Sequence, residues 1–434
     1  MTNAGRSETQ GGTFQRDAWA FVLGLGQGGL GTARGLGEQG VRVVGVDWDR
    51  HAPGFASRWC ERRLVIPHPA REPRRALEML LAAARRLDAP AVLLPTTDVY
   101  LEFLARHERE LRDSFSFTLN DSPWREALTN KRLQGDLIQA NGIAYPQTYH
   151  PRDQDDVRRI GREVRFPALL KPVHGHLWYP RFHTKAIAVR SQDDLERRYA
   201  EAERHGLDLM VQSEIVGPPT NEYGCTVHVD RQGRVLGIAT RRKLRIYPLD
   251  FGTSSFLVGV RCPEVERMAV DLLERIGYRG TGSVAFKRDA RDGKLYVLEL
   301  NGRLIGPTIH SLRCGVNLPL LAYLDLTGQS PSPAPPMCPG VRFLDLTPDI
   351  LVFRELHRRG ELGLLEWLRS LASARVYSHF DARDPLPFLA TRRNDLRRAV
   401  ALARQRGGGP RTRQDWRPTT VVERAPERGD SPGP

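Results

Sequence analysis

The sequence contains little lysine, no paired cysteines and no long apolar run. Only six of its 65 Lys and Arg residues are lysines. Its five cysteines are scattered, with no pair at the spacing of a metal site, which is typical of free thiols in a reducing compartment. No apolar run approaches the roughly 18 residues that a membrane-spanning helix needs. These absences predict a cytoplasmic protein without a transmembrane segment or a disulfide framework.

The net charge of +14 does not by itself indicate a nucleic-acid-binding protein. Arginine fills nearly every basic position along the whole chain, which indicates a general composition bias rather than one basic face. No patch of basic residues interleaved with aromatics is present, so we expect no specific nucleic-acid binding. The length of 434 residues, with 40% hydrophobic and 27% charged residues, predicts two to three ordinary globular domains.

The few lysines are informative because arginine is the default basic residue here. A lysine that is kept in such a chain indicates a need for a compact ammonium, which contacts phosphate as a point charge. All six lie between residues 131 and 294: Lys131, Lys171, Lys185, Lys243, Lys287 and Lys294. Their clustering points to a phosphate site in this part of the chain.

The first third of the chain has the pattern of a parallel α/β sheet. A buried strand at 18–23 runs into the glycine-rich stretch 24–29, a helix at 30–39 and a strand at 41–46 that ends at Asp47. This arrangement could bind a dinucleotide, with Asp47 on a ribose, and would then make the protein an NAD(P)-dependent oxidoreductase. Many strand–helix–strand units of this kind bind no dinucleotide. The sequence leaves open whether this one does.

The same pattern continues with a helix at 71–86, a strand at 91–95 and a helix at 101–111. Thr96 to Asp98 follow the carboxyl end of a strand, where ligands bind in parallel sheets. They could equally cap the next helix, and this second interpretation is favoured.

A predicted strand at 295–300 carries three polar side chains on one face or just beyond it. Glu299, Asn301 and Arg303 share that face because side chains alternate along a strand. Carboxylate and amide oxygens suit Mg²⁺, and an arginine fork suits a phosphoryl group. The alternative is a strand that ends in a solvated polar loop.

Two further lysines lie on neighbouring predicted strands. The strand at 166–172 carries Lys171, and Lys185 opens the strand at 186–189. Antiparallel pairing of these strands would place both ammonium groups in a lid over a polyphosphate. Two ordinary surface lysines are the alternative.

From Lys131 to about residue 328, the order of these motifs resembles that of the ATP-grasp superfamily. Within it, the chain is similar to carboxylate–amine ligases of the carbamoyl-phosphate synthase and D-aspartate ligase type. The resemblance covers nearly the whole chain. It rests on Asn130-Lys131, residues 166–172 with Lys185, residues 210–217 with Glu222, residues 242–253, residues 278–289 and residues 298–303.

The resemblance implies a set of site residues. Lys131, Lys171 and Lys185 would be cofactor-binding lysines, the last two on the phosphates of ATP. Ser213, Glu214 and Ile215 would bond adenine through backbone groups, and Glu222 would accept from the ribose. Glu299 and Asn301 would ligate Mg²⁺ (or Mn²⁺), Arg303 would steady the transferred phosphoryl group, and Lys243 or Arg245 would bind the substrate carboxylate or the acyl phosphate.

The resemblance also implies a fold that combines α/β and α+β parts. A Rossmann-like preATP-grasp domain would span 16–125 and a two-subdomain ATP-grasp domain 126–330. A proline-rich linker at 331–340 and a helical C-terminal region at 341–406 would follow, with disordered ends at 1–15 and 407–434. A basic amphipathic helix at 392–406 could touch an anionic membrane weakly, although contact with its own domain is favoured.

The chain departs from the family pattern at two places. Ala285 stands where the family normally has a second metal-binding glutamate, and His174-Gly175-His176 stands where a richer glycine and serine loop is usual. Catalysis with one metal, a ligand from elsewhere, and a non-catalytic nucleotide-binding regulatory module are all open. The two histidines could contact phosphate.

The sequence therefore predicts an ATP-dependent ligase. ATP would convert a small-molecule carboxylate into an acyl phosphate, and an amine would attack it to give an amide or peptide bond, ADP and phosphate. The acid and the amine are not identified, and a homo-oligomer is possible.

Overall fold

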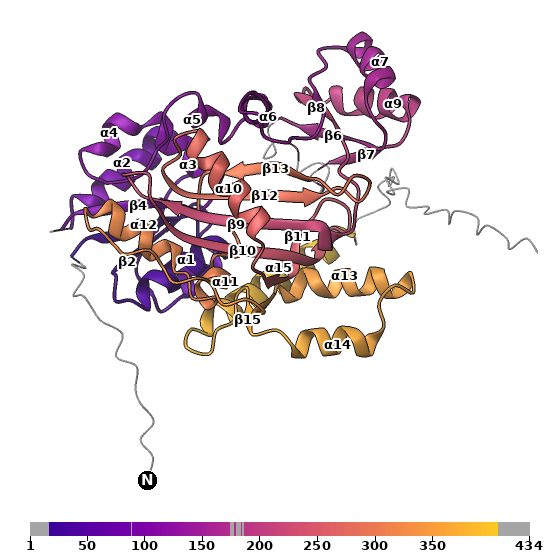
Figure 1. The fold of residues 1–434 in the computed structure, drawn as a ribbon. Coiled ribbons are helices and arrows are strands. Elements are labelled where there is room, and N and C mark those ends of the chain that lie inside the picture. Colours follow the sequence, from indigo (N-terminus) through magenta and orange to yellow (C-terminus); the bar gives the residue numbers. More distant parts are fainter. Residues whose placement is uncertain (1–16, 88, 174–177, 179–183, 185, 407–434) are drawn as a thin grey trace, which may run out of the picture. The chain divides into compact units, whose positions relative to one another are not determined.

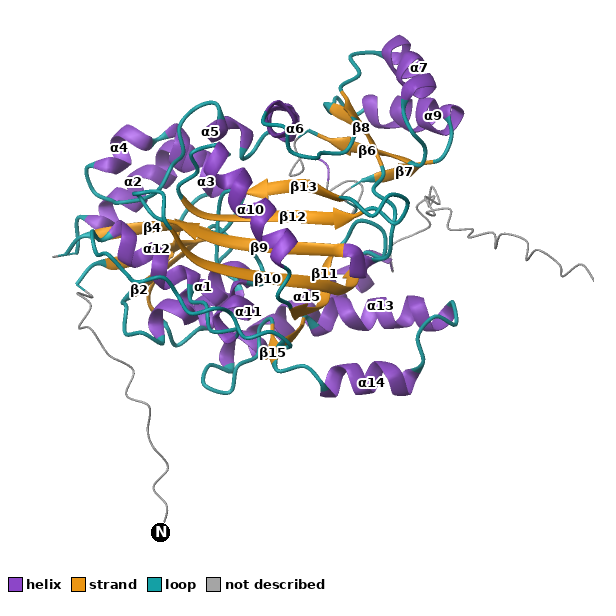
Figure 2. Cartoon of the chain, viewed as in Figure 1, coloured by secondary structure: helices purple, strands orange, loops and turns teal. Residues whose placement is uncertain are grey.

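The computed structural model describes residues 17–406 except residue 88, residues 174–177 and 179–183, and residue 185 (Figures 1 and 2). The predictions for residues 1–15 and 407–434, for Lys185 and for the two loop histidines lie outside the described residues. The chain divides into two compact units after Thr391. The described residues of the first unit form three sheets, with strand orders β3-β2-β1-β4, β13-β12-β9-β10-β11-β14-β15 and β5-β8-β6-β7.

The first sheet is parallel, as predicted. Strands β1 and β2 are buried along their whole length, which is typical of parallel sheets covered by helices. The elements of this region are β1 (Trp19–Leu23), α1 (Gln27–Gly37), β2 (Val43–Asp47), η1 (Pro53–Ala56), β3 (Cys60–Val65), α2 (Pro73–Ala84), β4 (Ala91–Pro95), α3 (Asp98–Arg106) and α4 (Glu108–Arg112).

The prediction of a single helix at 101–111 is wrong. Helix α3 ends at Arg106 and α4 begins at Glu108, because His107 leaves helical geometry with φ −112° and ψ 26°. The His107 ring is buried and lies 5.0 Å from that of Phe103.

The second sheet has seven strands, all paired antiparallel except β14 with β15. Helix α10 covers one face, where its buried apolar side chains join Val227, Val284 and Phe286 in one core cluster. The elements are α5 (Trp124–Ala127), α6 (Lys131–Ala140), η2 (Pro219–Asn221), β9 (Glu222–Val229), β10 (Val235–Tyr247), β11 (Thr253–Gly259), α10 (Pro263–Arg275), β12 (Gly280–Arg288), β13 (Leu295–Asn301), β14 (Arg342–Leu344) and β15 (Val376–Tyr377).

The third sheet is a small antiparallel layer that carries two helices (Figure 1). Its β6 and β7 pair antiparallel, as predicted for the two strands beside the lysines. Its elements are β5 (Thr148–Tyr149), α7 (Gln154–Glu163), β6 (Ala168–Pro172), β7 (Ile187–Val189), α9 (Gln192–Glu203) and β8 (Leu209–Ser213).

The remaining helices are α11 (Thr308–Arg313), α12 (Leu318–Leu326), α13 (Leu346–Arg358), α14 (Leu364–Ala372) and α15 (Leu386–Arg406). No helix among the described residues is long and apolar enough to cross a membrane. The proline-rich stretch lies against the second sheet, since Ala334 N–H donates to Leu236 and Met337 is buried. The domain boundaries given above stay predictions, as does membrane contact by residues 392–406.

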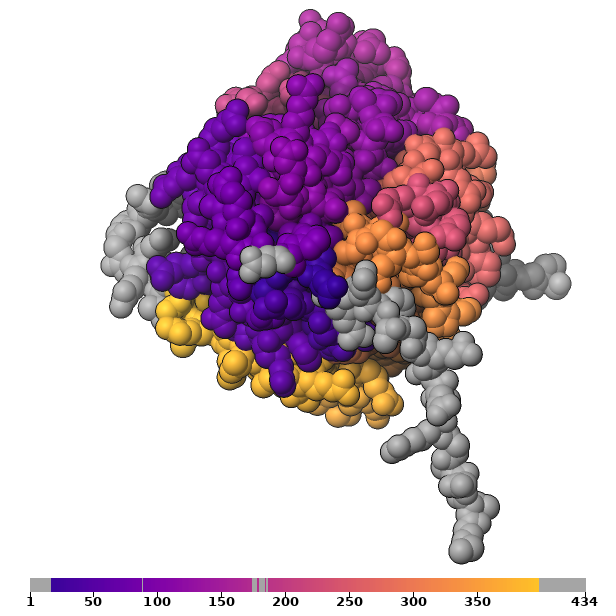
Figure 3. Space-filling view, turned by 90° about the vertical axis from the view of Figure 1, so that its left-hand side faces the viewer, coloured from indigo at the N-terminus to yellow at the C-terminus, as the bar shows by residue number. Residues whose placement is uncertain are grey.

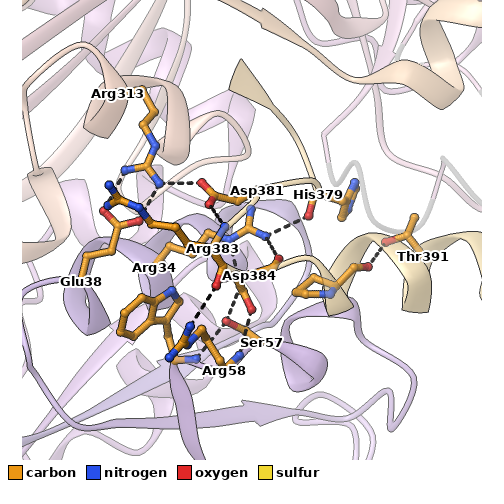
Figure 4. Close-up of polar contacts among 12 residues, drawn as sticks. Arg34, Glu38, Ser57, Arg58, Arg313, His379, Asp381, Arg383, Asp384 and Thr391 are labelled. Atoms are coloured by element: carbon orange, nitrogen blue, oxygen red, sulfur yellow. Dashed lines mark hydrogen bonds and ion pairs between the residues drawn. The ribbon is translucent and has the colours of Figure 1, made fainter. Parts of the chain in front are cut away.

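A buried ion-pair network joins two regions about 350 residues apart in sequence. Arg34 of α1 donates to the Asp384 carboxylate at 3.0 Å, and both side chains are almost completely buried (Figure 4). Ser57 and the backbone N–H of Arg58 also donate to Asp384, at 2.7 and 2.9 Å. In the space-filling view, yellow C-terminal surface accordingly borders the indigo N-terminal surface (Figure 3).

Because Arg34 is buried, removal of its partner should be costly. We expect Asp384→Ala to lower the free energy of unfolding by about 3–5 kcal/mol, since it leaves an uncompensated guanidinium in the interior. Denaturant titration measures this. Glu61→Ala breaks an exposed pair with Arg42 and should have little effect on stability. Equal effects of the two substitutions would contradict the structural role of the Arg34–Asp384 pair.

Two buried histidines should make stability depend on pH. Burial lowers the pKa of His228 and of His310 to about 4, from 6.5 for an ordinary histidine. Between these values the unfolded chain binds more protons than the folded chain, so stability falls as the pH falls from about 6.5 to about 4. Each histidine contributes up to about 1.4 kcal/mol per pH unit in that window.

Replacement of one of these histidines should therefore flatten the pH dependence. His310→Gln retains a donor for the Val341 carbonyl, which the imidazole Nε2 contacts at 3.0 Å, but it cannot titrate. We expect a shallower loss of stability below pH 6.5, measured by denaturant titration at several pH values. A slope identical to that of the wild type would argue against the effect.

Candidate functional site

The face of the second sheet opposite α10 carries a group of polar side chains in register. Antiparallel pairing places three consecutive rows across β13, β12, β9 and β10. Side chains in one row point to the same face. The rows are Asn301–Ser283–Thr226, Glu299–Ala285–Gly224–Arg241, and Lys287–Glu222 with Lys243 one strand further on.

Glu299 and Asn301 share this face at the end of β13, as the alternation predicts. Arg303 lies just beyond the strand. Its Nη2 donates a hydrogen bond to Asn301 Oδ1 at 3.3 Å. Its guanidinium also pairs with Asp98 at 2.5 Å, and it reaches the Thr96 carbonyl at 3.4 Å. The Thr96–Asp98 segment therefore anchors Arg303, and neither Thr97 nor Asp98 provides the side-chain cap that was favoured.

Glu222 lies between two lysines. Lys243 Nζ is 2.5 Å from Glu222 Oε2, and Lys287 Nζ is 3.7 Å from Oε1. All three groups are largely buried, and two ammonium groups beside one carboxylate give the cluster a net positive charge at the edge of the polar face. Lys287 was not among the predicted site residues, although the scarcity of lysine had already singled it out.

Lys171 lies on β6 of the third sheet, where its Nζ donates to Gln212 Oε1 at 2.9 Å. Gln212 in turn donates to Thr148 at 2.8 Å, which links three strands of that sheet. Lys185 lies outside the described residues, so the predicted pair of lysines is placed only in part. Lys131 is the first residue of α6 and is partly exposed.

The predicted adenine-binding residues begin at Ser213, the last residue of β8. The backbone N–H of Ser213 donates to the Gln147 carbonyl and that of Glu214 donates to the Pro167 carbonyl. The Glu214 carbonyl accepts from Arg291 at 2.7 Å. Burial raises the pKa of the Glu214 carboxyl, an effect that the nearby Lys287 partly offsets. Within the described chain, the backbone N–H of Ile215 has no partner.

Arg245, which was considered for substrate binding, is engaged with another part of the chain. It forms a two-pronged contact with Asp349 of α13, with both N–O distances 2.8 Å. Asp349 is completely buried and also accepts from Ser255 and from the Trp367 indole, at 2.8 and 2.9 Å. Arg245 thus ties β10 to the C-terminal helices, and Lys243 is the better candidate of the two for a substrate contact.

This interpretation of Arg245 predicts a loss of stability. Arg245→Met would leave the buried Asp349 carboxylate without a cation, at a cost of about 3–5 kcal/mol in denaturant titration. The double variant Arg245→Met/Asp349→Asn also removes the unpaired Asp349 carboxylate, so most of the lost free energy of unfolding should return. An unchanged stability of the single variant would instead favour the substrate-binding role.

The glycine-rich loop near the N-terminus is occupied by the chain itself. The Asp47 carboxylate accepts from the backbone N–H groups of Leu25 and Asp49, at 2.6 and 2.9 Å. A Cβ on Gly28 would lie 2.9 Å from the Ile305 carbonyl, and one on Gly31 would lie 2.7 Å from the Ile309 nitrogen. The glycines allow α1 to approach residues 305–309 closely, and Asp47 holds the loop rather than being directed at a ribose.

No family model matches the chain. A D-aspartate ligase from Enterococcus faecium is 23% identical over 252 residues, which cover 55% of this chain and 60% of that ligase. The biotin carboxylase domain of the 2-oxoglutarate carboxylase from Hydrogenobacter thermophilus was solved as a dimer with MgADP. It matches with a TM-score of 0.60 and 18% identity over 76% of this chain and 74% of that chain. An L-amino acid ligase from Bacillus licheniformis matches with a TM-score of 0.57 and 16% identity, over 76% and 79% of the two chains.

The chain has the ATP-grasp fold. The predicted mixed α/β fold class is confirmed by these structures. In this ATP-grasp fold, the three polar rows come from the second sheet and Lys171 from the third. Arg303 is held by Asp98, the first residue of helix α3, which follows β4 of the first sheet. The fold does not favour the NAD(P)-dependent alternative, and the filled glycine loop gives a physical reason.

Proposed function

We propose that the protein is an ATP-dependent carboxylate–amine ligase. The observation that carries the proposal is the polar face of the second sheet, where Glu299, Asn301 and Arg303 lie in a chain with the ATP-grasp fold. In the proposed reaction, a carboxylate oxygen of the substrate attacks the terminal phosphorus of ATP and ADP leaves. The amine nitrogen then attacks the acyl carbon and phosphate leaves, which gives an amide.

The residues of this face fit one divalent cation. Glu299 offers a carboxylate and Asn301 an amide oxygen, the hard oxygen ligands that Mg²⁺ prefers. When bound, Mg²⁺ would supply charge neutralisation and polarisation at the phosphates. Mn²⁺ could use the same ligands, and the two metals are compared in the experiment below.

The chain's own residues would position ATP and stabilise charge. Lys171 is proposed to contact phosphate from the third sheet, and Arg303 is proposed to steady the transferred group through the donors that Asp98 and Asn301 leave available. Adenine would bond the N–H of Ile215, because those of Ser213 and Glu214 already donate within the protein. Such catalysis depends on positioning and electrostatics rather than on a nucleophile.

Glu222 is proposed to accept from the ribose hydroxyls, with Lys243 and Lys287 holding its carboxylate charged and in place. Lys131, at the start of α6, and Lys185 complete the proposed nucleotide-binding lysines. The cytoplasmic location and the possible homo-oligomer also stay part of this proposal.

The deciding measurement is ADP release by the purified protein with Mg²⁺ or Mn²⁺ across pools of amino acids and other carboxylates. We expect release that depends on particular pools and that Glu299→Gln abolishes. Binding of ATP without release from any pool would favour a non-catalytic nucleotide-binding module. Absence of ATP binding would overturn the proposal.

Lysine substitutions provide a matched test of the nucleotide site. Lys171→Met should weaken ATP binding by roughly tenfold to a hundredfold, because it removes a charge-assisted contact with phosphate. Lys294→Met removes the same charge from the exposed turn before β13 and should leave binding unchanged. Calorimetric titration of both variants measures this, and equal affinities would count against a role for Lys171.

A further inference from the structure

Arg241 of β10 lies in the same row as Glu299, separated from it only by two small residues. The pairs are Glu299 with Ala285, Ala285 with Gly224, and Gly224 with Arg241, each directly opposite on adjacent antiparallel strands. Because one row faces one side of a sheet, the carboxylate and the guanidinium point to the same face. Nothing larger than a methyl group stands between them in this row.

The guanidinium of Arg241 extends across β9 towards β12. Its Nη1 donates to Thr226 Oγ1 at 2.9 Å, and its Nη2 donates to Ser283 Oγ at 3.2 Å. A Cβ on Gly224 would lie 2.5 Å from Nη2 and 2.6 Å from Cζ. Gly224 is therefore required by the close approach of this side chain, which comes to lie beside the strand that carries Ala285.

This partly buried cation forms no ion pair within the described residues. No carboxylate among the described residues lies within ion-pair distance of Arg241, and both of its hydrogen-bond partners are neutral hydroxyls. Burial lowers its pKa to about 10, an effect that the more distant Glu299 carboxylate partly offsets, so the group is still charged at neutral pH. A buried charge without a partner is unfavourable, which favours an anionic ligand at this position.

The described residues supply no substitute for the carboxylate missing at position 285. No group of three His, Cys, Asp or Glu side chains suitable for a metal occurs in the described ranges. Asp289, on the same strand, is held instead by Arg291. The row thus offers one carboxylate, Glu299, and one guanidinium on the same face.

The charges of such a row suit a polyphosphate with a single cation. One Mg²⁺ with one carboxylate and one guanidinium carries the same net charge as two Mg²⁺ with two carboxylates. A guanidinium also presents paired donors that match a phosphate group. We propose that Arg241 binds the polyphosphate directly in place of a second divalent cation, so that the site works with one metal. This inference rests on the proposed function.

The first arm of the experiment counts bound metal on the wild-type chain. Mn²⁺ is titrated by electron paramagnetic resonance in the presence of a non-hydrolysable ATP analogue, and one Mn²⁺ per chain is expected. Two bound Mn²⁺ per chain would overturn the inference while leaving the ligase proposal intact. Failure of the wild type to bind the analogue with any metal would overturn both.

The second arm measures affinity for the same analogue in substituted chains. Arg241→Met should weaken binding by on the order of tenfold or more, and Arg241→Lys, which keeps the charge but not the fork, should weaken it less. Arg242→Met is the matched control, because the neighbouring side chain points to the opposite face of β10. Unchanged affinity of Arg241→Met would overturn the inference.

The third arm restores the missing carboxylate. Ala285→Glu alone should still bind one Mn²⁺, because the new carboxylate pairs with Arg241. The double variant Arg241→Met/Ala285→Glu frees that carboxylate and should bind a second Mn²⁺. Thermal melting identifies any variant that fails to fold, and the wild-type stoichiometry tests the inference without any substitution.

Discussion

The register of the antiparallel sheet is the constraint on which the candidate site depends. Backbone hydrogen bonds between β13, β12, β9 and β10 set which residues stand opposite one another, and so bring Glu299 and Arg241 into one row. A slip of one residue in any of these strands would turn its polar side chains to the opposite face, which α10 covers with apolar residues. The core on one face therefore specifies the site on the other.

The abundant arginines of this chain divide by their partners. Arg34 and Arg245 meet buried carboxylates, Asp384 and Asp349, and tie distant segments to one another. Arg303 meets Asp98 at the start of helix α3, which holds it beside Asn301. Arg241 meets only hydroxyl groups among the described residues, and it is the one of these four that is suited to an external anion. The same residue type thus serves the fold or the ligand according to what surrounds it.

Local patterns in the sequence predicted many elements because they depend on neighbouring residues alone. The strand at 295–300 follows from the alternation of its side chains, and the parallel N-terminal sheet follows from strands that alternate with helices; the structure has both. The break of the helix at His107 was not predictable in this way, since it accompanies the burial of one ring against Phe103. The scarcity of lysine singled out Lys287, whereas Arg241 is one of many arginines and carried no such signal.

The sequence by itself determined the order of the motifs, whose resemblance to ATP-grasp proteins implied the fold class. It also determined the polar face of β13, which depends on residue types at fixed spacing. Tertiary structure alone decided which charges are available. Asp47 is used by its own loop and Arg245 by Asp349, while Arg241 forms no ion pair in the described chain. The physical reason is that an ion pair depends on distances between strands and helices far apart in sequence, and these distances exist only once the sheets have formed.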